Sequence, residues 1–296
     1  MAGERLNAAR ERVSKLGFWS GPVDPQPLTG GITNLNFRVV DGQSDYVVRI
    51  GEDIPVHQVM RFNELAANRA AYLAGIAPEV VHAEAGVLIT RFINATTLTA
   101  SLARDPAFVE RFIPVLQKCH RDVPRYLRGP VLTFWPFHVV RDYALRLSED
   151  NSRHVPKLVT LMASAEVLEQ AVGPTELVFG HNDMLAGNLL DDGSRIWMID
   201  WEYAGFGSPL FDLANFASNN ELDEAQERGL LDAYFDRAPD DALWHRYAAM
   251  KVASLLRETM WSMVSEHHSK IDHDYAAYTA ENLVRFGRAY DIFRTL

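Results

Sequence analysis

A short polar stretch, HNDMLAGNLL at residues 181–190, contains the side chains of this chain that are best suited to chemistry. Asp183 and Asn188 belong to this stretch, and Asp200 follows it. Placing carboxylate and amide groups among leucines is costly unless each finds a partner. Phosphoryl transfer needs a carboxylate that accepts the proton of a hydroxyl, and an amide oxygen and a carboxylate that hold Mg²⁺. The residue types therefore predict Asp183 as a base and Asn188 and Asp200 as metal ligands.

The neighbouring sequence predicts how these three side chains come together. The apolar residues LVF at 177–179 precede the polar stretch, and LLDDGSRIWMID at 189–200 reads as a β-hairpin. Because a hairpin folds back on itself, Asp200 is expected to return next to Asn188. The alternative is an ordinary polar turn, in which Asp and Asn side chains cap their own backbone.

The remaining elements divide into strands first and helices later. Alternating patterns predict strand pairs at 34–40 with 45–50 and at 80–83 with 87–92, and helical patterns occupy 4–16 and 56–74. Longer helical patterns follow at 106–121, 137–149, 153–171, 221–235, 241–266 and 273–294. This segregation predicts an α+β fold, with a small β-rich N-terminal lobe at 1–92 and a larger helical C-terminal lobe at 93–296.

Composition limits the class of protein. The chain has 296 residues, of which 48% are hydrophobic, and it carries a net charge of −10 without a basic run, which argues against a nucleic-acid partner. Cys119 is the only cysteine, so no internal disulfide can form, and a reducing compartment is expected. The N-terminus lacks the apolar core of a signal peptide, and no apolar run has the length of a membrane span. We therefore expect a cytoplasmic protein; the oligomeric state is open.

The spacing H-x-D-x-x-x-x-N followed by I-D-x-E resembles the catalytic loop and metal motif of the protein-kinase-like superfamily. The matching positions are His181, Asp183, Asn188, Ile199, Asp200 and Glu202. Within that superfamily the sequence is most similar to the choline and ethanolamine kinases, which are related to aminoglycoside phosphotransferases. The resemblance implies a bilobal protein-kinase-like fold with ATP and Mg²⁺ between the lobes. It also implies that His181 and Asp212 support the catalytic loop.

The same resemblance implies a glycine-rich phosphate loop, and LTGGITNLNFRVV at 28–40 fits it. Gly30 and Gly31 allow the backbone to approach phosphate closely, and Thr33 and Asn34 add polar side chains. Paired glycines also occur in many ordinary hairpins. Their position before the first predicted hairpin is what favours the phosphate loop.

Three further residues take nucleotide-binding roles in the resemblance. Arg49 lies where protein kinases have a lysine and choline kinases an arginine, and its guanidinium can bind phosphates through two nitrogens. Glu64, on the predicted helix at 56–74, corresponds to the carboxylate that holds this cation. Phe92 belongs to RFINATTL, which resembles the hinge that reads the adenine edge. An exposed strand arginine and a solvated helix glutamate are the alternatives.

The segment WSMVSEHHSKIDHDYAAYTAENLVRF resembles the choline-pocket segment of choline kinases. On that match Trp261, Asp272, Tyr275 and Tyr278 line the substrate pocket, together with Tyr203 from IDWEYAG. Aromatic faces and a nearby acid are the groups that bind a quaternary ammonium. The alternative is that aromatic residues at helical spacing pack a core.

Glu258 departs from the family pattern, which often has a second tryptophan three residues before Trp261. A carboxylate there suits a primary ammonium, which donates hydrogen bonds, so ethanolamine or another small amino alcohol is expected as a substrate besides choline. Two alternatives stay open. One is a related kinase for an aminoglycoside, a sugar or thiamine, and the other is a nucleotide-binding regulatory protein without turnover. The second predicts a missing base or metal ligand, and none is missing.

The histidines suggest packing rather than metal binding. His120 follows Cys119 in a predicted helix and is expected to pack there. His267, His268 and His273 lie close together but have no thiolate partner, which is typical of solvated or pocket-rim histidines.

Overall fold

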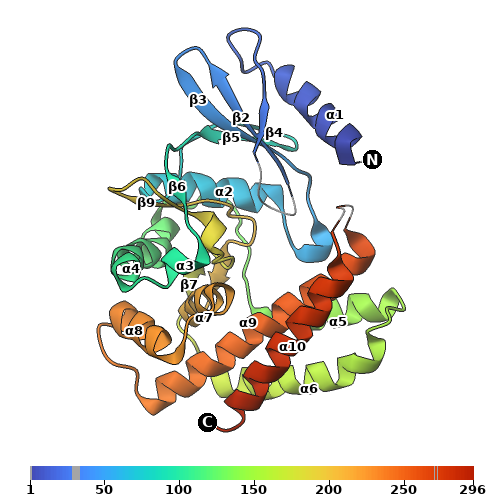
Figure 1. Cartoon of the computed structure of the whole chain (residues 1–296), viewed down its shortest axis with the longest axis vertical. Helices are drawn as coiled ribbons and strands as arrows, with labels where there is room; N and C mark the ends of the chain where they lie inside the picture. Colours follow the sequence, from blue (N-terminus) through green and yellow to red (C-terminus); the bar gives the residue numbers. More distant parts are fainter. Residues whose placement is uncertain (1, 29–33, 270, 272) are drawn as a thin grey trace.

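A five-stranded antiparallel sheet forms the N-terminal part of the fold, in the order β1-β2-β3-β5-β4 (Figure 1). The structure is a computed structural model, and it describes residues 2–28, 34–269, 271 and 273–296. The strands are β1 (Gln26–Leu28), β2 (Leu35–Asp41), β3 (Ser44–Ile50), β4 (Val80–Glu84) and β5 (Val87–Arg91). The two predicted strand pairs are confirmed, and Gly42 and Gly86 supply positive φ angles of 61° and 71° in their turns.

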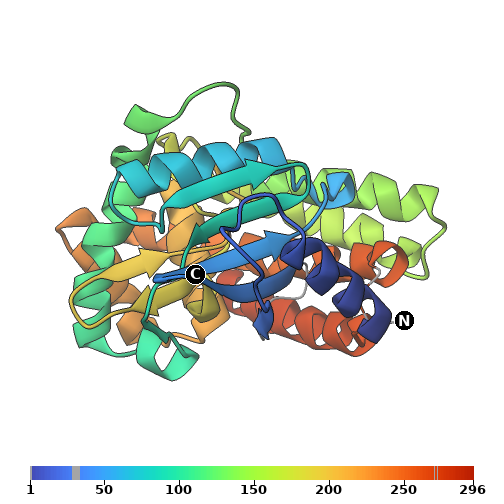
Figure 2. The same cartoon turned by 90° about the horizontal axis from the view of Figure 1, so that it is seen from above.

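The two faces of this sheet have different tasks. Because side chains alternate along a strand, one face buries Phe37, Val39, Val48 and Ile89 against α1 (Ala2–Ser14) and the segment after it. In Figure 2 α1 and α2 lie on opposite sides of the sheet. The face away from α1 presents side chains to a large cavity, namely Asn36, Val47, Arg49, Leu88 and Thr90.

The predicted helix at 56–74 is wrong in its first part. A short 3₁₀-helix, η1 (Pro55–His57), comes first, and α2 (Arg61–Leu73) begins after a break. Gln58 adopts a left-handed φ of 59°, and Ile54 pairs with Val59 as an isolated bridge, which a continuous helix cannot contain. The predicted end of the helix at Gly75 is confirmed by its φ of 78°.

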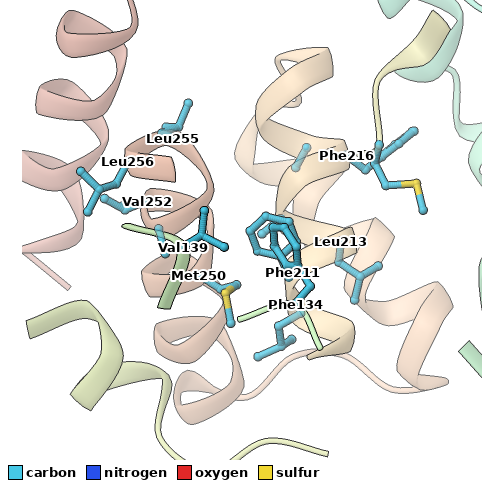
Figure 3. Close-up of a cluster of buried hydrophobic side chains, with 14 of the residues drawn as sticks. Phe134, Val139, Phe211, Leu213, Phe216, Met250, Val252, Leu255 and Leu256 are labelled. Atoms are coloured by element: carbon cyan, nitrogen blue, oxygen red, sulfur yellow. The ribbon is translucent and has the colours of Figure 1, made fainter. Parts of the chain in front are cut away.

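Helices form most of the rest of the molecule. They are α3 (Ala100–Ala103), α4 (Pro106–Arg121), η2 (Val123–Tyr126), α5 (Pro136–Glu149), α6 (Val155–Val172), α7 (Pro209–Asn220), α8 (Glu224–Phe235), α9 (Asp241–His268) and α10 (Tyr275–Phe293). The long α9 is central and packs against α5, α6, α7 and α10. Figure 3 shows side chains of α7 and α9 meeting Phe134 and Val139 in the buried core. The predicted helices are present with ends shifted by a few residues, and the α+β class is confirmed.

Two small sheets carry the polar stretch. β7 (Val178–Gly180) pairs with β10 (Gly205–Gly207). β8 (Leu189–Asp191) pairs with β9 (Ile196–Met198), and its other edge pairs with β6 (Thr96–Thr97). The expected boundary of the lobes at residues 92 and 93 stays a prediction. Within the described residues, no helix is both long and apolar enough to span a membrane.

Candidate active site

The predicted hairpin brings the catalytic loop and Asp200 together. After β7 the chain forms a loop and the 3₁₀-helix η3 (Ala186–Asn188), and it then enters β8 and β9. The Ile199 backbone N–H donates to the Asn188 carbonyl at 3.0 Å, which returns the next residue, Asp200, to the loop as expected. The Asn188 amide Nδ2 donates to the Asp183 carbonyl oxygen at 2.9 Å and to its Oδ2 at 3.1 Å. Asp183, Asn188 and Asp200 all line one cavity of about 540 Å³.

Buried polar contacts hold the loop backbone. Asp212 of α7 accepts hydrogen bonds from the backbone N–H groups of His181, at 2.8 Å, and Asn182, at 2.7 Å. The His181 ring Nε2 lies 2.9 Å from the Ile199 carbonyl, and the His120 ring Nε2 lies 2.9 Å from Asp212 Oδ2. The predicted supporting roles of His181 and Asp212, and the packing role of His120, are therefore confirmed.

The carboxylates of the loop have perturbed acidity. Burial raises the pKa of Asp183 to about 7, although the Arg257 charge opposes the shift. The pKa of Asp200 is also raised, first by burial and then by the charges of Glu202, Glu64 and Asp183. Oδ1 of Asp200 is buried without a hydrogen-bond partner among the described residues. Buried carboxylates with an unpartnered oxygen favour the binding of a cation beside Asp200.

A divalent cation fits this place. Glu64, Asp200 and Glu202 each offer a carboxylate oxygen, and the three oxygens lie within 4.8 Å of one another. Asp200 also has the unpartnered Oδ1, and Asn188 lines the same cavity. Hard oxygen donors of this kind are the ligands that Mg²⁺ prefers. Asn188 and Asp200 remain the predicted metal ligands, and the carboxylate of Glu202 lies next to that of Asp200.

The predicted pair of Arg49 and Glu64 is present. Arg49 Nη2 lies 2.5 Å from Glu64 Oε2, and the side chain of Glu64 is almost fully buried. Arg49 also approaches Glu202 at 3.3 Å and Asn34 at 3.4 Å. Asn34 donates from Nδ2 to Glu202 Oε1 at 2.5 Å. The predicted residues Gly30, Gly31 and Thr33 lie outside the described residues.

Arg61 is a member of this cluster that we did not anticipate. Its Nη1 binds Glu64 Oε2 at 2.8 Å and also Glu202, and its Nη2 donates to Asn34 Oδ1 at 2.8 Å. The available signal was the spacing of Arg61 and Glu64, because residues three apart on a helix are neighbours. Two arginines and two glutamates balance one another here, which limits the cost of burying them.

Phe92 lines the cavity, but its backbone N–H is already engaged. That N–H donates to the Asp45 carbonyl at 3.0 Å and so continues the sheet pairing. The guanidinium of Arg38 lies over the ring, 4.2 Å from its centroid. Thr90, Arg91 and Ile93 line the same part of the cavity. Any reading of an adenine edge by this segment must therefore use groups other than the Phe92 N–H.

Four of the expected substrate residues belong to the same cavity. Tyr203, Glu258, Trp261 and Tyr278 line it. Trp261 Nε1 donates to the Tyr203 hydroxyl at 2.9 Å, and the Tyr278 hydroxyl donates to Glu258 Oε1 at 2.7 Å. Tyr275 does not belong to this lining among the described residues.

Tyr275 supports the wall from behind. Its ring centroid lies 6.0 Å from that of Trp261, and its hydroxyl accepts a hydrogen bond from Ser269 at 2.8 Å. It is therefore a packing residue of the pocket rather than a lining one. Asp272 lies outside the described residues.

Arg257 was also missed by the sequence analysis. It lines the cavity, and only 3% of its side chain is exposed. Its Nη1 donates to Glu258 Oε2 at 2.8 Å, and its guanidinium carbon lies 4.5 Å from the centroid of the Tyr203 ring. The adjacent charged residues Arg257 and Glu258, between the apolar pairs LL and MW in SLLRETMW, were the available signal.

His57, in the short helix η1 before α2, packs against the expected substrate residue Trp261. Its ring lies 5.1 Å from the Trp261 ring, and its nitrogens lie 3.0 Å from the Tyr143 hydroxyl and 3.2 Å from Ser265 Oγ. Burial, followed by the charges of Arg257 and His268, lowers the pKa of His57 to about 3, so this ring is neutral.

The three histidines near the end of α9 were expected to be solvated or at the pocket rim. His267, His268 and His273 are exposed, and His268 pairs with Asp150 at 2.6 Å. In the described ranges, the residue types that bind metals gather into a candidate group at Glu64, Asp200 and Glu202, which includes no histidine.

Comparison with known proteins assigns this chain to a family. Residues 24–250 match the phosphotransferase enzyme family. The chain belongs to this family. It is therefore a phosphotransferase, as the pattern of the catalytic loop predicted.

Relatives of the phosphotransferase include choline and ethanolamine kinases. A choline/ethanolamine kinase family protein from Mesorhizobium loti is 27% identical, with a TM-score of 0.76 over 98% of this chain and 99% of that one. A crystal structure of LicA in complex with AMP has a TM-score of 0.76 at 21% identity, over 97% and 98% of the two chains. A probable ethanolamine kinase from Arabidopsis thaliana is 23% identical over 85% of this chain and 75% of its own length. The predicted resemblance and the bilobal protein-kinase-like fold are confirmed.

Proposed function

We propose that this phosphotransferase transfers the γ-phosphoryl group of ATP, with Mg²⁺, to the hydroxyl of choline, ethanolamine or a related small amino alcohol. The observation that carries the proposal is one shared cavity. Asp183, Asn188 and Asp200 line it together with the phosphate anchor Arg49 and the substrate wall around Glu258. Its volume of about 540 Å³ is in the range of small-molecule sites.

Different charged groups act on the two carboxylates Asp200 and Asp183. Asp200 is influenced by Glu202, Glu64 and Arg49, whereas Asp183 is influenced first by Arg257 and Glu258. We infer that Asp183 lies between the predicted metal ligands and the substrate wall, because its Oδ2 accepts a hydrogen bond from Asn188 and the charges of Arg257 and Glu258 act on it. A hydroxyl bound at that wall would meet Asp183 before it meets the phosphate, as a base requires.

Each side chain then has a defined task. Arg49 binds phosphate oxygens through its guanidinium, and Glu64 holds Arg49 in place. Asn188 and Asp200 are the groups that would hold Mg²⁺, which when bound neutralises charge on the phosphates. Asp183 orients the substrate hydroxyl and accepts its proton, and its pKa of about 7 suits that exchange near neutral pH.

The substrate wall supports an amino alcohol. Glu258 is held by Tyr278 at one oxygen and by Arg257 at the other, so the carboxylate is oriented before any ligand arrives. A carboxylate has about four acceptor positions, so positions remain for an ammonium N–H. The proteins from Mesorhizobium loti and Arabidopsis thaliana carry choline or ethanolamine in their names, which agrees with this substrate class. The use of ATP and the single cysteine favour a cytoplasmic location.

Purified protein tested against a panel of alcohols, with ADP release as the signal, is the decisive experiment. We expect Mg²⁺-dependent turnover with ethanolamine and choline and much weaker turnover with aminoglycosides, sugars and thiamine. Asp183→Ala should lower kcat by roughly 10²- to 10⁴-fold, the usual contribution of a general base. Activity that survives this change within a few-fold would remove Asp183 from the role of base.

A matched control tests the loop itself. Asp191 lies in the same hairpin but pairs with Arg111 outside the cavity, at 2.7 Å. Asp191→Ala should therefore leave kcat within a few-fold of the parent protein. Nucleotide binding without turnover of any alcohol would instead favour the regulatory protein.

A further inference from the structure

A fixed positive charge lies in the wall that is expected to bind a positively charged substrate. Arg257 is almost fully buried and lines the cavity next to Glu258 and Asp183. Its Nε and Nη2 have no hydrogen-bond partner among the described residues. An arginine in a protein stays protonated, because its unperturbed pKa exceeds 12. A buried guanidinium with two unpaired nitrogens is costly, which makes a functional reason for it worth seeking.

The guanidinium already occupies an aromatic face. Its carbon lies 4.5 Å from the centroid of the Tyr203 ring, the distance of a cation–π contact, and 5.8 Å from that of Phe134. Tyr203 therefore already gives a face to a cation that belongs to the protein. Its hydroxyl is tied to Trp261 Nε1, which fixes the orientation of both rings. An incoming ammonium thus meets a wall whose cation–π capacity is partly used.

Arg257 also compensates the charge of Glu258. The two groups are joined at 2.8 Å, and such a pair acts at longer range as a dipole rather than as a net negative charge. A quaternary ammonium is shielded by its methyl groups and depends on that longer-range field and on aromatic faces. A primary ammonium instead donates N–H directly to a carboxylate oxygen, and this short contact persists when a neighbouring arginine shares the carboxylate.

We propose that Arg257 determines specificity by making the substrate wall favour a primary ammonium over a quaternary one. This inference rests on the proposed function of the same cavity and names the substrate class more narrowly. Arg257 acts as an internal cation that takes one face of Tyr203 and shares Glu258. The wall can then bind an ethanolamine-type headgroup by hydrogen bonds, but it offers a choline-type headgroup an incomplete cage.

The first test uses the unaltered protein. We expect kcat/KM with Mg·ATP to be higher for ethanolamine than for choline by roughly tenfold, about the value of one aromatic face. Preference for choline overturns the inference, while the proposed kinase function stands. Absence of ATP-dependent turnover with both alcohols refutes the proposed function and the inference with it.

The second test changes Arg257. Arg257→Met keeps the length of the side chain and removes the charge, so the choline-to-ethanolamine ratio of kcat/KM should rise roughly tenfold. Arg257→Lys keeps the charge and should keep the preference for ethanolamine. A ratio that stays unchanged in the Met variant overturns the inference, because damage to the fold alone would lower both substrates alike.

Two further variants keep the test decisive. Arg246 lies on the same helix and binds the Val172 carbonyl at 2.7 Å, away from the described cavity lining, so Arg246→Met should leave the ratio unchanged. If Arg257→Met fails to fold because Glu258 loses its charged partner, the double variant Arg257→Met with Glu258→Gln removes both charges. Its ratio should also move toward choline, and a move toward ethanolamine would overturn the inference.

Discussion

At the scale of single residues, the cavity gathers carboxylates and then balances them with arginines. Burial raises the pKa values of Asp183 and Asp200, and the charges of neighbouring carboxylates such as Glu202 raise them further. Arg49 and Arg61 neutralise Glu64 and Glu202 at the end proposed to bind phosphate, and Arg257 neutralises Glu258 at the end proposed to bind the substrate. Charge balance without a ligand therefore depends on arginines that different elements contribute.

The pKa of Asp183 predicts how activity depends on pH. A group with a pKa of about 7 is mostly protonated at pH 6 and mostly ionised at pH 8, and only the ionised form can accept a proton. We expect kcat/KM for the alcohol to rise by roughly tenfold between these values and then to level off, since kcat/KM reports the free enzyme.

The measurement is a pH profile of kcat/KM at fixed ionic strength. Asp191→Ala, which changes a carboxylate outside the cavity, should give the same profile as the parent protein. A profile of kcat/KM that is flat from pH 6 to pH 8 would show that Asp183 titrates outside this pH range or is not the base.

The site residues that could be predicted from the sequence are those whose partners lie close along the chain. Asp183, Asn188 and Asp200 belong to one loop and one hairpin, so their spacing was sufficient to predict that they meet. Arg257 was not predicted as a site residue, because its contact with Tyr203 joins α9 to a turn before β10 that is distant in sequence. Tyr275 was placed in the pocket by the resemblance to the choline-pocket segment, which does not reveal that its ring packs against Trp261 outside the lining.

At the scale of elements, β10 is held on both edges by backbone. It pairs with β7 on one side, and on the other Phe206 exchanges hydrogen bonds with Leu132, at 3.0 Å, and Phe134, at 2.7 Å. Asn182 reaches toward the carbonyl of Gly205 as well. The glycines of β10 therefore permit a close approach of three chain segments beneath the catalytic loop.

We predict that Gly205→Ala destabilises the protein. An added Cβ would lie 2.8 Å from the backbone carbonyl oxygen of Leu132, so the chain must shift, at a cost of about 1–3 kcal/mol. Gly229→Ala is the matched control, because that glycine lies inside α8 with no atom within 4 Å of a new Cβ. It should stabilise by about 1 kcal/mol through helix propensity. Urea unfolding of both variants measures the two effects, and equal stabilities would contradict this account.

Elements with one apolar face were predictable, and elements buried on all sides were not. Helices α4 and α5 alternate apolar and polar residues with a helical period, and they were predicted almost to the residue. Helix α7 was missed because nearly all of its side chains are buried, polar ones included, which removes the periodic signal. The break at Gln58 was missed because no Gly or Pro marks it.

At the scale of the whole molecule, a sheet core and a helical core meet at the cavity. The sheet buries its own cluster against α1, and the helices bury another around α9. The cluster of Arg49, Arg61, Glu64 and Glu202 joins β3, α2 and the segment after β9 across this junction. Ligands that bind in the cavity contact both parts and should stabilise the whole.

We therefore predict a Mg²⁺-dependent increase in Tm with ATP. At a nucleotide concentration about 100 times Kd the gain is about 2.7 kcal/mol, which corresponds to a shift of roughly 5 °C for a chain of this size. Asp200→Asn should remove most of the part that needs Mg²⁺, since a carboxylate ligand is lost. The measurement is thermal unfolding with ATP, with and without a chelator. An equal Mg²⁺-dependent shift in Tm for the parent protein and for Asp200→Asn would exclude Asp200 as a ligand.

The position of His57 shows that the substrate wall is not a product of the helical lobe alone. This residue precedes α2, yet its ring covers the indole of Trp261 and its nitrogens face Tyr143 and Ser265. If residues 93–296 were expressed by themselves, that indole and that phenol would be left without their neighbour. The proposed alcohol recognition therefore needs the undivided chain, and we expect that helices grafted onto a foreign nucleotide-binding module would not retain it.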